Sequence, residues 1–214
     1  MNIRTYSFLD NVLISLDHGI RTVFGNPPVT ERDNPAVSCD ETELTGQDKR
    51  LSARLMRVNH AGEVAAQALY EGQALTARLP GVRDTMERAA MEENDHLLWC
   101  AQRVQELGLH TSVLNPLWYT GSFAIGALAG LAGDKWSLGF VAETEHQVVQ
   151  HLEDHLQRIP AQDNKSQAIL QQMKADESRH ATTALEAGGN ELPEAVKKLM
   201  ALTSKVMTRT AYWL

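Results

Sequence analysis

The chain contains the motif Glu-x-x-His twice, as Glu93-Asn94-Asp95-His96 and as Glu177-Ser178-Arg179-His180. A lone glutamate precedes each motif, Glu63 by 30 positions and Glu145 by 32 positions. Side chains three positions apart share one face of an α-helix, so each motif presents a carboxylate and an imidazole to the same point. The repeated pattern therefore predicts two helical hairpins whose four helices direct six such side chains inward.

Six inward polar side chains indicate a metal site. Four carboxylates and two imidazoles are costly to bury alone, whereas two ferrous ions would balance the four negative charges. Oxygen donors with one imidazole per ion favour iron or manganese over zinc, and they leave open positions for dioxygen. This donor pattern is that of the di-iron site in ferritin-like four-helix bundles. The expected metal ligands are Glu63, Glu93, His96, Glu145, Glu177 and His180.

The pattern also predicts how these ligands divide between the two ions. Glu93 and Glu177 are expected to bridge the ions, and the remaining glutamate and histidine of each half would complete one ion each. Glu143 is an alternative to Glu145, but positions two apart on a helix differ by about 200°, so only one of them can face inward. Glu145 gives the closer match between the two intervals and is preferred.

Three further residues are candidates for supporting roles. Ligating imidazoles usually donate their second ring N–H to an acceptor. Asp176 is expected to accept from His96, and Glu92 from His180, unless each is a solvent-exposed acidic residue. His151 lies about 120° around its helix from the lone glutamate of that half. It is therefore either a relay for protons or electrons or a hydrogen-bonded core histidine.

The chain is expected to fold as an all-α, ferritin-like four-helix bundle with a long crossover between its hairpins. An amphipathic helix precedes the bundle and an extra helix follows it. Residues 1–47 are expected to hold the N-terminal helix and a loop, and residues 48–214 the di-iron domain. The expected elements are helices at 6–23, 48–79, 82–108, 134–158 and 163–187, a loop at 24–47, a crossover at 109–133 and a last helix from after Pro193 to about 210.

Composition narrows the classes of function. The formal net charge of -7 argues against nucleic acid as a partner. Cys39 and Cys100 have no metal-binding spacing and are expected to be reduced thiols, and the N-terminus shows no signal-peptide pattern. Residues 111–133 carry no charge, yet their apolar part is shorter than the roughly 20 residues that a membrane span needs. This segment is expected to be a buried crossover or to dip into a membrane interface.

Five segments resemble, in order, the signature of the demethoxyubiquinone hydroxylase family, and the chain is similar to its bacterial branch. The resemblance covers about residues 48–214. It implies a di-iron monooxygenase that hydroxylates a ring in the penultimate step of ubiquinone biosynthesis. All six family ligands are present, and the four glutamates among them are the implied catalytic residues. The segments are Leu55–Glu63 (LMRVNHAGE), Tyr70–Gln73 (YEGQ), Glu92–His96 (EENDH), Val141–Glu145 (VAETE) and Asp176–His180 (DESRH).

The resemblance also implies the molecules with which the chain works. The substrate is demethoxyubiquinol (2-polyprenyl-3-methyl-6-methoxy-1,4-benzoquinol), with dioxygen as co-substrate and NADH or an equivalent as reductant. Its long tail implies a peripheral protein on the cytoplasmic side of the cell membrane, and a partner protein that presents the quinone is left open. The apolar stretch from Trp118 to Leu131 has glycines that permit close helix approach or leave room for a chain. The N-terminal helix either lies on the membrane or caps the bundle.

Two rival functions make different demands on the site. Another ferritin-like enzyme, such as a peroxide reductase, a radical generator or an iron oxidase, would bind iron without hydroxylating a quinol. A lipid-binding helical protein would bind no metal, and its six inward polar side chains would then have no purpose.

Overall fold

The computed structural model describes residues 7–25, 29–30, 32–40 and 43–214, so the expected start of the first helix at residue 6 and parts of the expected 24–47 loop lie outside it. Within these ranges the chain forms seven α-helices and one short 3-10 helix, η1, and no strand. The elements are α1 (Phe8–Phe24), η1 (Pro35–Ser38), α2 (Gly46–Thr76), α3 (Pro80–Glu106), α4 (Asn115–Leu131), α5 (Asp134–Arg158), α6 (Asn164–Glu186) and α7 (Glu194–Ala211).

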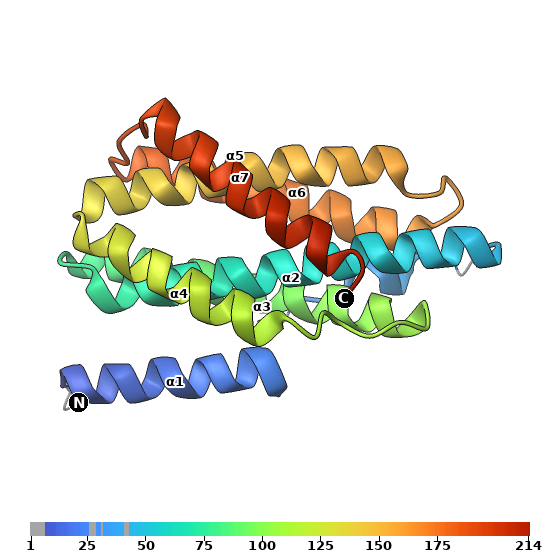
Figure 1. Cartoon of the computed structure of the whole chain (residues 1–214), viewed down its shortest axis with the longest axis horizontal. Coiled ribbons are helices and arrows are strands. Elements are labelled where there is room, and N and C mark those ends of the chain that lie inside the picture. The colour runs from blue at the N-terminus through green and yellow to red at the C-terminus, as the bar shows by residue number, and fades with distance from the viewer. Residues whose placement is uncertain (1–6, 26–28, 31, 41–42) are drawn as a thin grey trace.

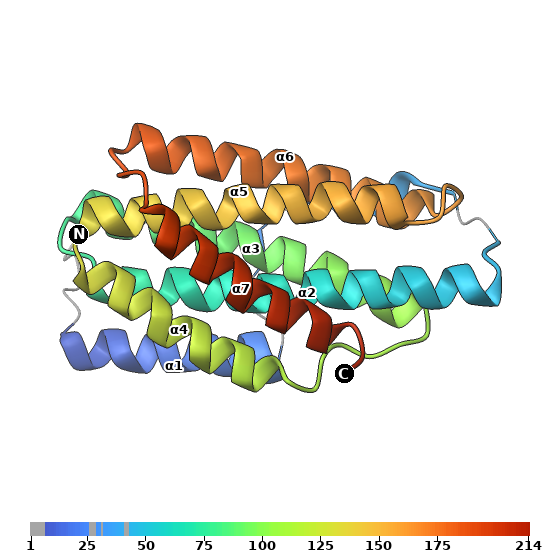
Figure 2. The same ribbon diagram turned by 45° about the horizontal axis from the view of Figure 1, so that its top comes forward.

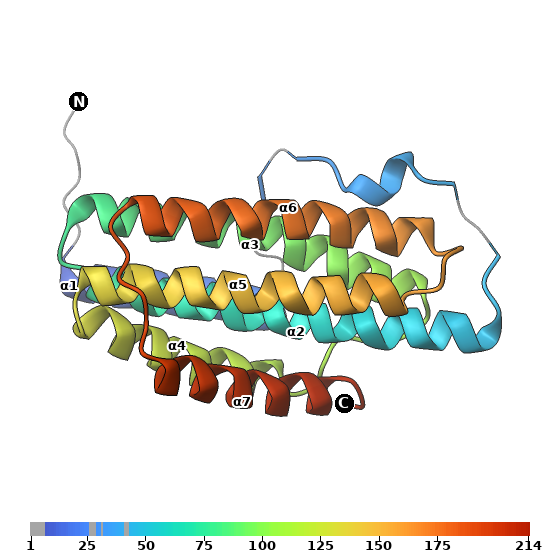
Figure 3. The ribbon, with the colours of Figure 1, turned by 90° about the horizontal axis from the view of Figure 1, so that it is seen from above.

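Helices α2, α3, α5 and α6 run side by side along the molecule and form a four-helix bundle (Figure 1). α2 and α3 make one hairpin, α5 and α6 make the other, and α4 crosses between them. α1 lies beside α4, and α7 runs obliquely across the bundle (Figure 2). Seen from above, α4 and α7 share one side of the bundle, whereas α3 and α6 form the opposite side (Figure 3). This arrangement confirms the predicted all-α fold class.

Capping residues define the helix ends that align the bundle. Thr45 Oγ1 accepts a hydrogen bond from Asp48 N (3.1 Å) at the start of α2, and Asp163 Oδ1 accepts one from Ser166 N (3.1 Å) at the start of α6. Such caps satisfy backbone N–H groups that have no partner inside the helix. After α6, Gly188 has a φ of 97°, a conformation that favours glycine and ends the helix. The bundle helices therefore begin and end close to their predicted positions.

Two apolar clusters fill the bundle on either side of a polar layer. One cluster contains Leu55 and Trp99, and the other contains Tyr70 and Met86. Along α2, the buried Glu63 lies between the residues of the two clusters. The candidate metal ligands are therefore enclosed by apolar packing at both ends, which strengthens every electrostatic interaction among them.

Most of the crossover is a helix, α4, and one side of this helix is exposed. Pro116 lies in the first turn of α4, where proline is tolerated since its missing N–H has no helical partner. Leu117, Leu128 and Leu131 are 59%, 67% and 58% exposed. The expectation of a buried crossover is therefore wrong for this side of α4. In the described part of the chain, no helix is long and apolar enough to cross a membrane.

The inner side of α4 lies very close to α2. A Cβ atom at Gly126 would clash with the backbone of Leu69, and one at Gly72 would clash with the backbone of Phe123. Gly130 is packed in the same way against Thr76. The prediction that glycines in this segment permit close helix approach is confirmed at these positions, and the crossing holds α4 firmly beside the centre of the bundle.

Candidate metal centre

The six predicted ligands come from all four bundle helices. α2 and α5 each supply one glutamate, and α3 and α6 each supply both residues of a Glu-x-x-His motif. All of them are buried, so none depends on solvent for its polar contacts. They are Glu63 (3% exposed), Glu93 (1%), His96 (0%), Glu145 (1%), Glu177 (1%) and His180 (9%).

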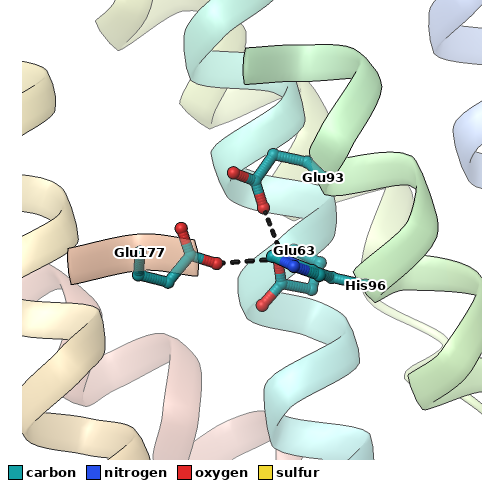
Figure 4. Close-up of side chains that lie close together, drawn as sticks. All are labelled: Glu63, Glu93, His96 and Glu177. Carbon is teal, nitrogen blue, oxygen red and sulfur yellow. Dashed lines mark hydrogen bonds and ion pairs between the residues drawn. The ribbon is translucent and has the colours of Figure 1, made fainter. Parts of the chain in front are cut away.

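Three carboxylates converge on His96 (Figure 4). The Nδ1 atom of His96 lies 3.0 Å from Glu177 Oε1, 3.2 Å from Glu93 Oε2 and 3.7 Å from Glu63 Oε2. One potential ligand atom from each of the four residues lies within 4.8 Å of the others. Donor atoms this close together can share one metal ion.

A second group forms around His180. Its Nδ1 atom lies 3.0 Å from Glu177 Oε2 and 3.3 Å from Glu93 Oε1, and Glu145 completes this group. Glu93 and Glu177 therefore belong to both groups, and each turns a different oxygen toward each histidine. This is the geometry that bridging carboxylates between two ions require.

The structure distinguishes between the two alternative glutamates of α5. Glu145 faces the centre and is 1% exposed. Glu143 instead accepts a hydrogen bond from Gln147 Nε2 (2.7 Å), and its other oxygen lies 4.0 Å from Lys197 Nζ. Among the described residues Glu143 belongs to neither metal-compatible group. The preferred residue is thus the one that reaches the centre, and its role as a ligand stays a prediction.

The second ring nitrogen of each histidine meets the acceptor expected from the sequence. His96 Nε2 lies 3.0 Å from Asp176 Oδ2, and His180 Nε2 lies 2.8 Å from Glu92 Oε2. A proton on Nε2 that is donated to a carboxylate leaves the Nδ1 lone pair free for a metal. Both Nδ1 atoms accordingly face the carboxylate groups. The sequence carries no signal that could have told which ring nitrogen points inward.

Two arginines that sequence reasoning missed hold these acceptors. Arg32 Nη1 lies 2.8 Å from Asp176 Oδ2. Arg179 bridges the two acceptors, with Nη2 2.8 Å from Glu92 Oε2 and Nη1 3.0 Å from Asp176 Oδ1. Arg179 stands inside the second motif, so its position was a weak signal. Arg32 stands in a predicted loop, where no local pattern identifies its partners.

The electrostatics of the cluster match a site that binds cations. Burial raises the pKa of Glu63 and of Glu145 well above the usual value, and the negative charge of Glu177 adds to the shift of both. Burial also tends to raise the pKa of Asp176, but its hydrogen bonds with His96 and Arg32 outweigh this effect and lower its pKa. The Oε1 atom of Glu145 is buried and accepts no hydrogen bond. The donor set and this unsatisfied oxygen fit two divalent metal ions.

His151 lies apart from both groups. Its ring centroid is 3.9 Å from that of His155, and its Nε2 atom is buried and has no hydrogen-bond partner. Among the described residues it is in neither metal-compatible group, although it lines the cavity next to the centre. The relay role and the core role both stay predictions.

A cavity of about 680 Å³ leads to the centre. The four candidate glutamates line its buried end, and apolar side chains such as Trp118 and Phe140 line its walls. Ile125 on α4 and Leu199 and Leu202 on α7 also line it and are 40%, 63% and 61% exposed, so the mouth lies between these two helices. The cavity thus joins an apolar surface to a buried group of carboxylates.

Fold and site together define a ferritin-like helical protein with a buried carboxylate–histidine cluster that could hold metal. Among solved structures, a dodecameric thioferritin from Bacteroides fragilis, a bacterioferritin-related protein, superposes with a TM-score of 0.55 and 16% identity. The match covers 67% of this chain and 85% of that one. At this identity the likeness concerns the fold alone, and it confirms the ferritin-like architecture.

The chain belongs to the family described as ubiquinone biosynthesis protein COQ7, whose model matches residues 50–211. A relative from Nitrosococcus oceani is 68% identical over 99% of both chains. One from Acinetobacter baumannii is 56% identical over 99% of this chain and 100% of its own, and one from Pseudomonas fluorescens is 56% identical over 98% and 97%. Each of these relatives is named 3-demethoxyubiquinol 3-hydroxylase. The family, the ferritin-like fold and the carboxylate–histidine cluster support iron binding.

Proposed function

We propose that this chain is a 3-demethoxyubiquinol 3-hydroxylase, a di-iron monooxygenase of ubiquinone biosynthesis. The observation that carries the proposal is the cavity that joins an apolar mouth to the buried carboxylate–histidine cluster. The name shared by relatives that match nearly the whole chain supports the same activity. Its substrate would be 2-polyprenyl-3-methyl-6-methoxy-1,4-benzoquinol, with dioxygen as co-substrate.

The proposed metal ligands are the six residues that converge between the hairpins. Glu93 and Glu177 would bridge two irons, and each histidine with its nearer lone glutamate would complete one iron. Bound iron would supply the redox chemistry for dioxygen, and the protein supplies position and a dry pocket. Asp176 and Glu92 would hold the imidazoles so that Nδ1 faces the irons.

The cavity would bind the substrate by its two chemically different ends. Its walls are apolar and suit a polyprenyl tail, while the carboxylate end receives the quinol ring. The apolar clusters on either side of the polar layer exclude water from the reacting ring. Electrons would come from NADH or an equivalent donor, directly or through the quinone, although the sequence has no glycine-rich motif that would bind a dinucleotide strongly.

We infer a peripheral position on the cytoplasmic side of the cell membrane, with the cavity mouth facing lipid. Exposed leucines of α4 and α7 surround that mouth. α1 docks with one side only, because His18 Nδ1 lies 2.6 Å from Glu71 Oε1 on α2 and Val23 packs against the apolar cluster that contains Tyr119. Its apolar residues Leu13 and Ile20 consequently remain 56% and 61% exposed. We therefore propose that α1, within the N-terminal segment 1–47, faces the membrane beside the di-iron domain at 48–214.

The test is the quinone profile, measured by mass spectrometry, of a host that lacks its own hydroxylase. The host receives either this chain or its Glu93→Ala form. We expect the intact chain alone to convert accumulated demethoxyubiquinone into ubiquinone. Conversion by the Glu93→Ala form would overturn the site assignment.

Failure of both chains would be interpreted from the metal content of the purified protein. Two bound irons without conversion would indicate another ferritin-like di-iron enzyme. Neither conversion nor metal would indicate a lipid-binding helical protein.

A further inference from the structure

A segment before the bundle reaches the outer side of the metal centre. Arg32 inserts its guanidinium between α3 and α6, with Nε 2.8 Å from Asp95 Oδ2 and Nη1 2.8 Å from Asp176 Oδ2. Thr30 supports the same contact, because its N donates to Asp95 Oδ1 (2.7 Å) and its Oγ1 donates to Asp95 Oδ2. The guanidinium also lies 5.2 Å from the ring centroid of Trp99. Arg32 therefore bridges the two helices that carry the Glu-x-x-His motifs.

The two carboxylates that Arg32 joins are both buried. The side chains of Asp95 and Asp176 are each 1% exposed, whereas that of Arg32 is 33% exposed. A buried carboxylate needs a charged or hydrogen-bonding partner to offset its lost hydration. Oδ2 of Asp176 contacts both Arg32 Nη1 and His96 Nε2. The same oxygen thus couples the guanidinium to the imidazole.

The acceptor of the other imidazole is held differently. Glu92, which lies 2.8 Å from His180 Nε2, has a side chain that is 26% exposed. Its arginine partner, Arg179, which also contacts Asp176 Oδ1 (3.0 Å), is 54% exposed. A planar guanidinium that contacts two buried carboxylates fixes their positions better than one that extends into solvent. The two halves of the centre therefore differ in how firmly their histidines are held.

We propose that Arg32 is a positioning residue for the metal position at His96. Held by Asp95 and Trp99, it fixes Asp176 as the acceptor of His96 Nε2–H. This orientation points His96 Nδ1 at Glu63, Glu93 and Glu177. The proposal rests on the di-iron site of the proposed function, and it makes the segment before the bundle part of that site.

The experiment is a titration of the metal-free full-length chain with cobaltous ion, followed by its visible absorption and by bound ions per chain. We expect wild type to bind two ions. Arg32→Met should bind one ion as wild type does and the second roughly 10- to 100-fold more weakly. Arg32→Lys should give an intermediate affinity, because an ammonium cannot contact both carboxylates as a guanidinium does. This milder variant also provides a test if Arg32→Met does not fold.

A matched control separates positioning from general stability. Arg103 on α3 also makes a buried bridge to α6, with Nη2 2.8 Å from Asp163 Oδ1 and Nε 3.0 Å from Ser166 Oγ. Arg103→Met should lower the unfolding temperature of the metal-free chain while both cobalt affinities stay at the wild-type value. Equal loss of cobalt affinity in the Arg103 and Arg32 variants would overturn the proposal.

A second set of variants identifies which ion is lost. Glu145→Gln should leave only the position at His96, and adding Arg32→Met should then abolish tight binding. In a Glu63→Gln background, Arg32→Met should have little further effect. If Arg32→Met binds two ions as tightly as wild type, this inference fails while the proposed function stands. If wild type binds no cobalt, the proposed function fails as well.

Discussion

His96 Nε2 and Asp176 Oδ2 lie 3.0 Å apart, although the two residues are separated by 80 positions in the chain. The contact joins α3 of one hairpin to α6 of the other. His180 and Glu92 make the reciprocal contact at 2.8 Å, from α6 back to α3. Each Glu-x-x-His helix therefore supplies ligands to the centre and also supplies the acceptor that orients the histidine of its partner helix.

The first prediction concerns this reciprocal contact. Asp176→Asn should weaken iron binding by roughly 10- to 100-fold, because the amide lacks the charge that pairs with Arg32 and orients His96. The measurement is a titration of the metal-free chain with ferrous ion under anaerobic conditions. Asp154→Asn is the control, since the side chain of Asp154 is 58% exposed and contacts Arg158. Unchanged affinity in Asp176→Asn would contradict an orienting role.

The second prediction concerns the pH dependence of the metal-free fold. Burial raises the pKa of Glu145 above its unfolded value of about 4.5, so the folded chain releases this proton at a higher pH than the unfolded chain does. The free energy of unfolding of the metal-free chain therefore falls as the pH rises above about 4.5. Glu145→Gln removes this loss of stability, because glutamine resembles the neutral acid. Urea unfolding in the presence of a chelator should show the variant more stable than wild type at pH 8.

The control for that prediction is the same comparison at pH 5. The advantage of Glu145→Gln should shrink there, since more of the unfolded glutamate is also protonated. Glu186→Gln, at an exposed position of α6, should change neither curve. A variant that is less stable than wild type at pH 8 would mean that Glu145 is ionised and well paired without metal.

The sequence predicted the convergence of six side chains because their positions follow from helix geometry alone. The i and i+3 spacing places Glu93 with His96 and Glu177 with His180, and the hairpins bring the lone glutamates alongside. The pairing of Asp176 with His96 could also be predicted from the sequence, because ligating histidines need an acceptor. The contacts of Arg32 could not be predicted, since they depend on the path of a loop that has no periodic pattern.

The sequence alone did not show that most of the crossover is a helix, although it was expected to be buried or to dip into a membrane interface. Its glycines weaken helix propensity. In the structure, the close approach of α4 to α2 at Gly72 and Gly126 stabilises a helix that local propensity does not favour. Tertiary packing therefore decides this element, and one sequence without its neighbours does not contain that information.

The third prediction tests this crossing. Gly126→Ala should lower the free energy of unfolding by more than about 2 kcal/mol, because the new Cβ would clash with the backbone of Leu69 and force the helices apart. Gly121→Ala on the same helix is the matched control. Its Cβ would meet nothing within 4 Å, so alanine should be neutral or stabilise by about 0.5–1 kcal/mol. Chemical denaturation of both variants decides the question, and equal effects would exclude a close crossing.

The fourth prediction concerns a buried histidine outside the metal groups. Burial lowers the pKa of His60 to about 4, whereas an unfolded histidine has a value of about 6.5. The unfolded chain therefore binds a proton more readily between these values, and stability is lost as the pH falls from about 6.5 to 4. The shift corresponds to roughly 3 kcal/mol. In His60→Gln the loss of unfolding free energy between pH 7 and 4 should be smaller by about this amount.

The control for His60 is an exposed histidine. His110→Gln should lose stability over this pH range as wild type does, because its side chain is exposed and contacts the neighbouring Thr111 O. Denaturant unfolding of the metal-free chains at several pH values provides the comparison. A His60→Gln curve parallel to that of wild type would show that His60 is not kept neutral by burial.

The fifth prediction concerns the exposed apolar side of α1. Leu9 and Leu13 are 66% and 56% exposed, because the helix turns its polar side toward Glu71 on α2. If this side enters a lipid surface, Leu9→Ser combined with Leu13→Ser should lower partitioning into phosphatidylcholine vesicles at least about tenfold, given roughly 1.5–3 kcal/mol for each fully buried leucine. Neutral lipid is appropriate because the chain has a net charge of -7 and would be repelled by anionic vesicles.

Val37→Ser is the control for this prediction. Val37 is 81% exposed but lies on η1, which packs on α6 away from α4 and α7 (Figure 3). Vesicle co-sedimentation that is unchanged in the double variant, or equally reduced in Val37→Ser, would assign the membrane contact to another surface.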